Sequence, residues 1–223
     1  MGRRACPAHT PVDARDCLAA ETDFGRQTQD VTQIHPTAIV EDGAELGENV
    51  SVGAFAYVGP HVVLGDNCSI HQRATVLGRT SLGKNVEVFP GAVIGSAPQI
   101  LNFKDDGTSR LEIGDETVIR EHVTIHRGTE HGGGETVVGN GNLLMVGSHV
   151  AHDCILADDI VIANQVMLAG HITVDACATI GGGAGINQFS RIGRCAYIGG
   201  LARITRDVPP FMIVEGSPAE VRA

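Results

Sequence analysis

The stretch from Met145 to Cys154 reads MVGSHVAHDC, with His149 and His152 three residues apart and Asp153 directly after the second histidine. Three uses of these side chains compete. They could be solvated turn residues without chemistry, which is the commoner role of an isolated histidine. Imidazole is also a common zinc ligand. Finally, a histidine beside a carboxylate is the arrangement of a general base and the group that orients it. Their neighbours in space decide among the three.

Aliphatic residues recur every six positions along most of the chain. A period of six is neither the 3.6 of a helix nor the 2 of an ordinary strand, and it is typical of the hexapeptide repeat of a parallel β-helix. The sequence therefore predicts an all-β prism whose aliphatic residues point inward and whose corners favour Gly or Asn. The series is Val40, Leu46, Val52, Val58, Leu64, Ile70, Val76, Leu82, Val88, Ile94 and Ile100; then Ile113, Ile119 and Ile125; then Val138, Leu144, Val150, Leu156, Ile162, Leu168, Val174, Ile180, Ile186, Ile192, Ile198 and Ile204.

The period breaks twice, which predicts loops near residues 101–112 and 126–137. Three hexads make one coil, and stacked coils lie about 4.8 Å apart. One column of stacked residues is therefore expected to hold Ile100, Ile125, Val150, Leu168, Ile186 and Ile204. Both loops would then leave from the same corner on successive coils, and we expect a site there.

Five polar side chains are expected at that corner: His126, His149, His152, His171 and Asn187. Their convergence from distant parts of the chain argues against isolated turn residues. Some trimeric β-helical carbonic anhydrases bind zinc through three histidines, but they use a pair five residues apart that this chain lacks. We therefore expect no metal and no cofactor. Acid–base catalysis, with His152 as base and Asp153 as its orienting group, is the favoured use.

The composition excludes several classes of protein. The 223 residues are 43% apolar but only 4% aromatic, which suits a fold of many thin layers. A net charge of −10 argues against nucleic acid or an anionic membrane as the partner. No apolar run approaches the ~20 residues that span a bilayer, and no signal peptide is evident, so we expect a cytoplasmic protein with reduced thiols and no stable membrane insertion. The expected organisation is an N-terminal extension over 1–30, a β-helix over 31–208 and a short C-terminal tail over 209–223.

Several strings resemble one family closely: VTIHRGT (123–129), HGGG (131–134), NLLM (142–145), HVAHDC (149–154), LAGH (168–171) and DVPP (207–210). They are similar to the UDP-N-acetylglucosamine 3-O-acyltransferases that open lipid A biosynthesis, and the similarity covers about residues 33–218. The resemblance implies a left-handed coil and a homotrimer with active sites between neighbouring prisms. It also implies an (R)-3-hydroxyacyl donor on acyl carrier protein and a UDP-sugar acceptor.

The resemblance assigns roles to single residues. It makes His152 the catalytic base, Asp153 its support, and Gly170 the residue whose backbone N–H faces the developing oxyanion. Substrate-lining positions are implied at His126, His149, His171 and Gln188, and an acyl-length position at Gly200, which leaves the cleft open. Four late arginines, either a docking patch for the acidic carrier protein or scattered surface charges, are Arg191, Arg194, Arg203 and Arg206.

Two departures from the family concern the nucleotide. The family commonly has His where this chain has Asn187 and Lys where it has Asn102, and Lys104 could substitute. We also expect little or no C-terminal helical domain, which in the family carries contacts to the nucleotide, and hence a roughly millimolar Kd for UDP-N-acetylglucosamine. Two alternatives stay open: the same donor with an amino-sugar or non-UDP acceptor, and a catalytically weak trimeric paralogue or scaffold.

Overall fold

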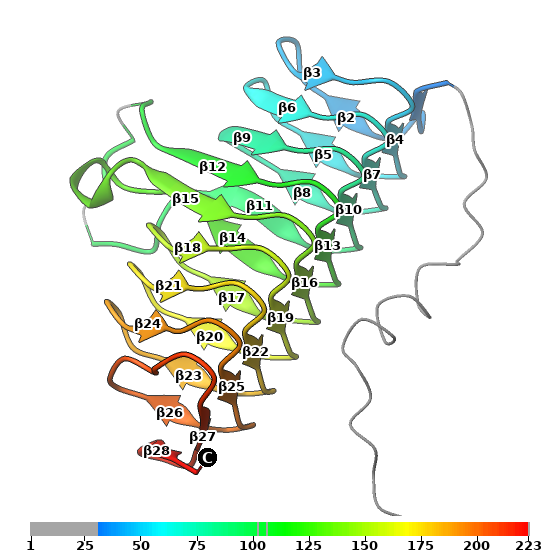
Figure 1. Cartoon of the computed structure of the whole chain (residues 1–223). Coiled ribbons are helices and arrows are strands. Elements are labelled where there is room, and N and C mark those ends of the chain that lie inside the picture. The colour runs from blue at the N-terminus through cyan, green and yellow to red at the C-terminus, as the bar shows by residue number, and fades with distance from the viewer. Residues whose placement is uncertain (1–30, 102, 106, 223) are drawn as a thin grey trace, which may run out of the picture. The chain divides into compact units, whose positions relative to one another are not determined.

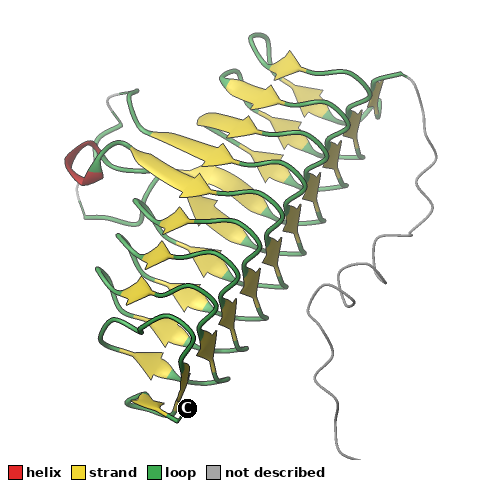
Figure 2. Cartoon of the chain, in the orientation of Figure 1, coloured by secondary structure: helices red, strands yellow, loops and turns green. Residues whose placement is uncertain are grey.

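The computed structural model describes residues 31–101, 103–105 and 107–222. The extension expected over residues 1–30 and the departure at Asn102 lie outside these residues. The unit from Val31 onward winds through three sheets, with each coil giving one short strand to each sheet (Figure 1). Strands and the turns between them make up nearly all of it (Figure 2). The fold is the expected left-handed parallel β-helix.

From β1 to β26 the strands enter the three sheets in strict rotation, and β27 and β28 then both join the first sheet. The first sheet contains β1 Gln33–Ile34, β4 Ser51–Val52, β7 Ser69–Ile70, β10 Glu87–Val88, β13 Val118–Ile119, β16 Leu143–Leu144, β19 Val161–Ile162, β22 Thr179–Ile180, β25 Tyr197–Ile198, β27 Ile213–Glu215 and β28 Glu220–Val221. The second contains β2 Ile39–Val40, β5 Tyr57–Val58, β8 Thr75–Val76, β11 Val93–Ser96, β14 Thr124–His126, β17 His149–Val150, β20 Met167–Leu168, β23 Gly185–Ile186 and β26 Arg203–Ile204. The third contains β3 Glu45–Leu46, β6 Val62–Leu64, β9 Arg79–Leu82, β12 Arg110–Ile113, β15 Glu135–Val138, β18 Ile155–Leu156, β21 Thr173–Val174 and β24 Arg191–Ile192.

The core is a column of aliphatic side chains inside the prism. Successive coils pair in register, so Leu144, Ile162 and Ile180 stack directly on one another. All three are fully buried, as is Ile160 at the second inward position of its hexad. Since each layer has room for only a few aliphatic groups, the prism needs no large aromatic rings, which explains the composition.

The expected position of Ile100 in this core is wrong. Ile94, not Ile100, pairs in register with Ile125, and Ile100 is 41% exposed in the first loop. The spacing of six continues past Ile94, but Pro98 has no N–H to give to a ladder, and the chain turns away from the prism. The first loop therefore spans 97–109 and the second 127–134. Both still connect the second sheet to the third, so they leave from one corner as expected.

The C-terminal boundary also differs from the expected one. β27 pairs in parallel with β25, so the first sheet continues to Glu215, beyond residue 208. β28 then folds back antiparallel on β27. Within the described residues the single helical element is a 3-10 turn, η1 Glu130–Gly132, in the second loop. No helix in this part of the chain is long and apolar enough to cross a membrane.

The alternation within one strand gives a test of the core. Leu64 points inward and is fully buried, whereas its neighbour Val63 is 38% exposed on the same strand. We expect Leu64→Ala to lower the free energy of unfolding by about 2–5 kcal/mol. Val63→Ala should cost less than about 1 kcal/mol. Urea denaturation of both variants measures the difference, and equal losses would contradict the inward assignment.

Candidate active site

A groove of about 380 Å³ runs along the edge where the second sheet turns into the third. Five of the residues expected from the sequence line it: His126, His149, His152, Gly170 and Asn187. They come from β14, β17 and the turns after β17, β20 and β23, so in-register stacking brings together residues far apart in the sequence. The groove is also lined by Gln99, Ala151, Met167, Leu168, Ala169, Gly185, Ile186 and Arg203.

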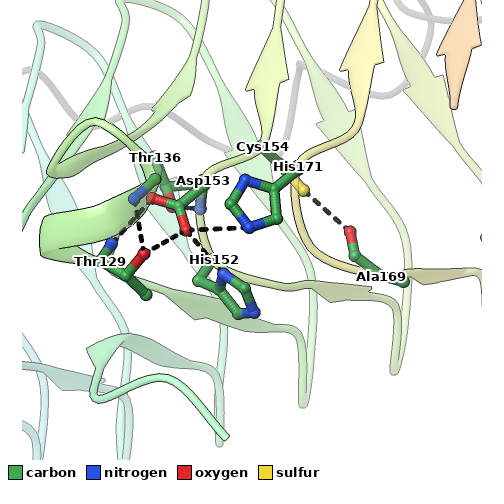
Figure 3. Close-up of polar contacts among 8 residues, drawn as sticks. Thr129, Thr136, His152, Asp153, Cys154, Ala169 and His171 are labelled. Atoms are coloured by element: carbon green, nitrogen blue, oxygen red, sulfur yellow. Dashed lines mark hydrogen bonds and ion pairs between the residues drawn. The ribbon is translucent and has the colours of Figure 1, made fainter. Parts of the chain in front are cut away.

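The central feature is a chain of hydrogen bonds that ends at His152 (Figure 3). The Nδ1 atom of His152 lies 2.7 Å from Oδ2 of Asp153. Asp153 is almost fully buried, with 1% of its side chain exposed, and Thr129 donates to it twice, from its backbone N–H and from its hydroxyl, both at 2.7 Å. A carboxylate only accepts hydrogen bonds, so Nδ1 of His152 carries the proton. The Nε2 atom is then the unprotonated nitrogen of the ring.

The second loop holds the Asp153 carboxylate in place through Thr129. Thr129 caps the 3-10 turn η1, and its hydroxyl accepts from Gly132 N–H while donating to Asp153. Asp153 itself sits in the left-handed region with φ 59°, and its N–H donates to the Thr136 hydroxyl on β15. The loop thus supplies hydrogen-bond donors to a buried carboxylate, whose burial without them would be costly.

His152 and Asp153, together with His171, form the one group in the described part of the chain that could hold a metal ion. Their spacing fits a shared proton better than an ion. Ligand atoms at ~2.0–2.1 Å around a tetrahedral zinc stand roughly 3.3 Å apart. Nδ1 of His152 and Oδ2 of Asp153 are 2.7 Å apart, the length of a charge-assisted hydrogen bond.

Gly170 lies directly beneath the His152 ring. A Cβ atom at Gly170 would come within 2.5 Å of Cε1 and 2.7 Å of Nε2 of that ring, so any side chain here would displace the imidazole. The Gly170 carbonyl accepts from Phe189 N–H. No acceptor for the Gly170 N–H occurs among the described residues. A free backbone donor therefore lies next to the ring nitrogen that faces the groove.

Two further histidines of the groove are held neutral. Burial, and then the nearby His149 and His152, lowers the pKa of His126 to about 4. Burial and then His152 also lower the pKa of His149, against the opposing effect of the Thr124 backbone. Nδ1 of His149 lies 2.7 Å from the Thr124 hydroxyl. The rings of His126 and His149 meet edge to face at 4.8 Å. Nδ1 of His126 is buried without a hydrogen-bond partner.

His171 lies behind the dyad rather than in the groove. Its Nε2 is 3.7 Å from Oδ2 of Asp153, and its ring stacks on Phe189 at 4.6 Å. Cys154, next to Asp153, is no nucleophile, because it is buried, donates to the carbonyl of Ala169 and has a pKa raised to about 12 by burial.

Four of the expected substrate residues do not line the groove of this chain: His171, described above, and Lys104, Gln188 and Gly200. Lys104 is exposed in the first loop, Gln188 is exposed beside Asn187, and Gly200 lies at the other end of the second sheet, after β25. The four late arginines do not form one cluster. Arg191 lies on the third sheet and pairs with Asp175, whereas Arg203 lies on the second sheet and lines the groove.

Sequence reasoning missed three contributors. Gln99 lines the groove from the first loop. Thr129 lay in a quoted string but received no role, although a Thr before a loop of glycines is a signal for a capped turn. Arg127 is buried and pairs with Asp105 at 2.8 Å, which ties the first loop to the start of the second.

Fold and site together define a β-helical protein with a histidine–carboxylate dyad in an edge groove, an arrangement suited to proton transfer. Comparison with known proteins narrows this class. The chain is 45% identical over 186 residues to the acyl-[acyl-carrier-protein]–UDP-N-acetylglucosamine O-acyltransferase of Rhizobium johnstonii and 50% identical to that of Agrobacterium fabrum. Each match covers 83% of this chain and 68% of the relative.

Solved structures agree. LpxA from Acinetobacter baumannii superposes with a TM-score of 0.83 at 39% identity, over 85% of this chain and 73% of that one. The UDP-N-acetylglucosamine acyltransferase from Campylobacter jejuni gives 0.83 at 38% identity, over 86% and 74%. No family model matches. The chain belongs to the acyl-[acyl-carrier-protein]–UDP-N-acetylglucosamine O-acyltransferase family.

The depressed pKa of His126 makes stability depend on pH. In the unfolded chain a histidine titrates near 6.5 and in the native state His126 titrates at about 4, so acid favours unfolding between these values. His126 should therefore cost wild type about 2 kcal/mol of unfolding free energy between pH 7 and pH 5. His126→Gln removes that part, so urea titrations at both pH values should show a smaller loss for the variant. Equal losses would contradict the neutral, buried state.

Proposed function

We propose that the chain transfers an (R)-3-hydroxyacyl group from acyl carrier protein to the 3-hydroxyl of UDP-N-acetylglucosamine, as the first step of lipid A biosynthesis. The observation that carries the proposal is the series of hydrogen bonds from Thr129 through Asp153 to His152, which leaves the unprotonated Nε2 of His152 at the groove. The names of the relatives supply the substrates. In this proposal the protein acts in the cytoplasm.

The first chemical step is removal of a proton from the acceptor. Nε2 of His152 takes the proton from the sugar hydroxyl as that oxygen attacks the thioester carbonyl. The imidazolium then carries a full positive charge, and the Asp153 carboxylate 2.7 Å away stabilises it. A positioned base of this kind contributes roughly 10²–10⁴-fold to the rate.

The second step is collapse of the tetrahedral intermediate. Its oxyanion would accept a hydrogen bond from the Gly170 N–H, the free donor beside the His152 ring. When the carbonyl re-forms, the carbon–sulfur bond breaks and the thiolate leaves. The thiolate takes the proton from Nε2 of His152, which restores the neutral base and yields free acyl carrier protein thiol and the sugar ester.

The remaining roles concern binding. His126, His149 and Asn187 line the groove and offer neutral donors and acceptors to the sugar. Arg203 is a cation within the same groove, where it can meet a phosphate. Lys104, Gln188, His171 and Gly200 keep their expected substrate roles if a neighbouring subunit closes the groove, as in the proposed homotrimer.

An acyl-transfer assay tests the acceptor directly. Purified protein is mixed with 3-hydroxyacyl carrier proteins of several chain lengths and with UDP-N-acetylglucosamine or its 3-amino analogue, and products are identified by mass spectrometry. We expect the ester product. Amide product alone would favour the amino-sugar alternative. The observation that favours that alternative is Asn187, which stands where the family commonly has His. Folded protein that acylates neither sugar would overturn the proposal.

Replacement of the base gives the sharpest single variant. His152→Ala should lower kcat at least ~100-fold, because no other neutral nitrogen is oriented by a carboxylate in the groove of the described chain. The ring is 15% exposed and packs on a glycine, so folding should be little affected. His61→Ala, a change at an exposed histidine several coils away, is the matched control.

Light scattering of both variants should give about 70 kDa, three times the 23.3 kDa of the chain. Full activity of the His152 variant would show that another group, such as His149, is the base. A monomer that retains activity would contradict the role given to the neighbouring subunit.

A further inference from the structure

Cys177 and Cys195 lie on the edge of the prism where the third sheet turns into the first, away from the candidate active site. They precede β22 and β25 and occupy the same corner position on successive coils. Both adopt left-handed backbone conformations, with φ 60° and 52°. The N–H of Cys177 donates to Asp158 and that of Cys195 to Ala176, each at 3.0 Å, so the two corners are built alike.

Backbone conformation does not explain cysteine at this corner. The left-handed region favours Gly, Asn and Asp, because short polar side chains tolerate it. Five of the six earlier coils obey this preference at the same corner, with Asn49, Asn67, Asn85, Gly141 and Asp159, and Glu116 is the exception. Cysteine has no such advantage, yet it occupies two consecutive layers. The pair therefore calls for a chemical explanation.

The geometry of the column suits a bond between layers. Stacked residues lie about 4.8 Å apart, within the 4.4–6.8 Å that disulfides span between Cα atoms. Side chains in this column do reach one another, since Nδ2 of Asn49 donates to Oδ1 of Asn67 at 3.2 Å. The Cys195 thiol is near enough to raise the pKa of Cys177.

Accessibility separates this pair from the other described cysteines. Cys68 and Cys154 are buried, and burial raises their pKa values to about 11 and about 12. Cys177 and Cys195 are only partly buried, so a small oxidant can reach them. Burial and then the neighbouring Cys195 raise the pKa of Cys177 above its ordinary value. In the reduced protein Cys177 is therefore mostly protonated at neutral pH and reacts slowly there.

We propose that Cys177 and Cys195 form a reversible disulfide that joins two successive coils when the protein meets a small-molecule disulfide. The thiolate of one cysteine attacks the oxidant, forms a mixed disulfide and releases one thiolate. The second cysteine, as thiolate, attacks the protein sulfur of the mixed disulfide and releases the other thiolate. Two electrons pass to the oxidant, and the two protons lost by the cysteines end on the released thiols.

The experiment treats the full-length protein with oxidised glutathione, blocks the remaining thiols and digests with trypsin. Cleavage after Arg191 and Arg194 separates the two cysteines into different peptides. We expect the Cys177 and Cys195 peptides to be joined, and to separate on reduction. The rate should rise about tenfold per pH unit between pH 7 and 8, because the thiolate is the attacking species.

Two variants test the geometry. Cys177→Ser should leave glutathione bound to Cys195 with no joined peptides. The double variant Asp159→Cys with Cys195→Ser moves the pair one coil earlier in the same column. Both cysteines of that pair then lie in the one tryptic peptide that ends at Arg191, so the bond should appear within that peptide as the loss of two hydrogen atoms and of both thiol-blocking groups. Glutathione on both natural cysteines without a bond between them would overturn the proposal. A Cys177 or Cys195 peptide joined to Cys6 or Cys17 would also overturn the proposal, as would a disulfide-linked dimer on a non-reducing gel.

Discussion

In-register pairing of successive coils is the constraint on which everything else in this structure depends. Each strand donates and accepts backbone hydrogen bonds with the strands of the coils before and after it, so the side chains of equivalent positions lie one strand spacing apart. Inward positions become a continuous aliphatic column. Outward and corner positions become ladders in which the identity of one residue restricts its neighbours, as the His152 ring restricts position 170 to glycine.

The site exists because the ladder tolerates insertions at corners. Residues between β11 and β12 and between β14 and β15 leave the prism, and the strands that follow the loops, β12 and β15, pair with their neighbours without a shift in register. The only irregularity among the described strand pairs is a bulge in β11 against β14, just before the first loop, where Ser96 pairs with His126. The first loop is tied back by the pair of Arg127 and Asp105, and the second by Thr129. The first loop thus adds Gln99 to the groove, the second holds Asp153 in place, and the rigid edge itself supplies the base.

Charge is distributed unevenly in the groove. One carboxylate, Asp153, is buried and receives donors from Thr129 and His152, whereas His126 and His149 are held neutral by burial. This arrangement distinguishes one imidazole from its neighbours: only His152 has a carboxylate within hydrogen-bonding distance of Nδ1 among the groove histidines described. Acid–base chemistry is thereby directed to one nitrogen, although several histidines lie close together.

The sequence by itself determined the fold, the corner that carries the site and the set of histidines there, because a strict six-residue period converts position in the chain into position in space. It misplaced Ile100, since a period can continue by chance into a segment where Pro98 cannot join a ladder. It did not predict the roles of Thr129 and Gln99 or the ion pair between Arg127 and Asp105, because loop residues do not follow the six-residue period that places the others. Which nitrogen of His152 faces the groove became clear only from the three-dimensional structure, because it depends on the hydrogen bond between Nδ1 and Asp153. The same holds for the late arginines, because the sheet and the direction of each side chain place Arg191 and Arg203 on different faces.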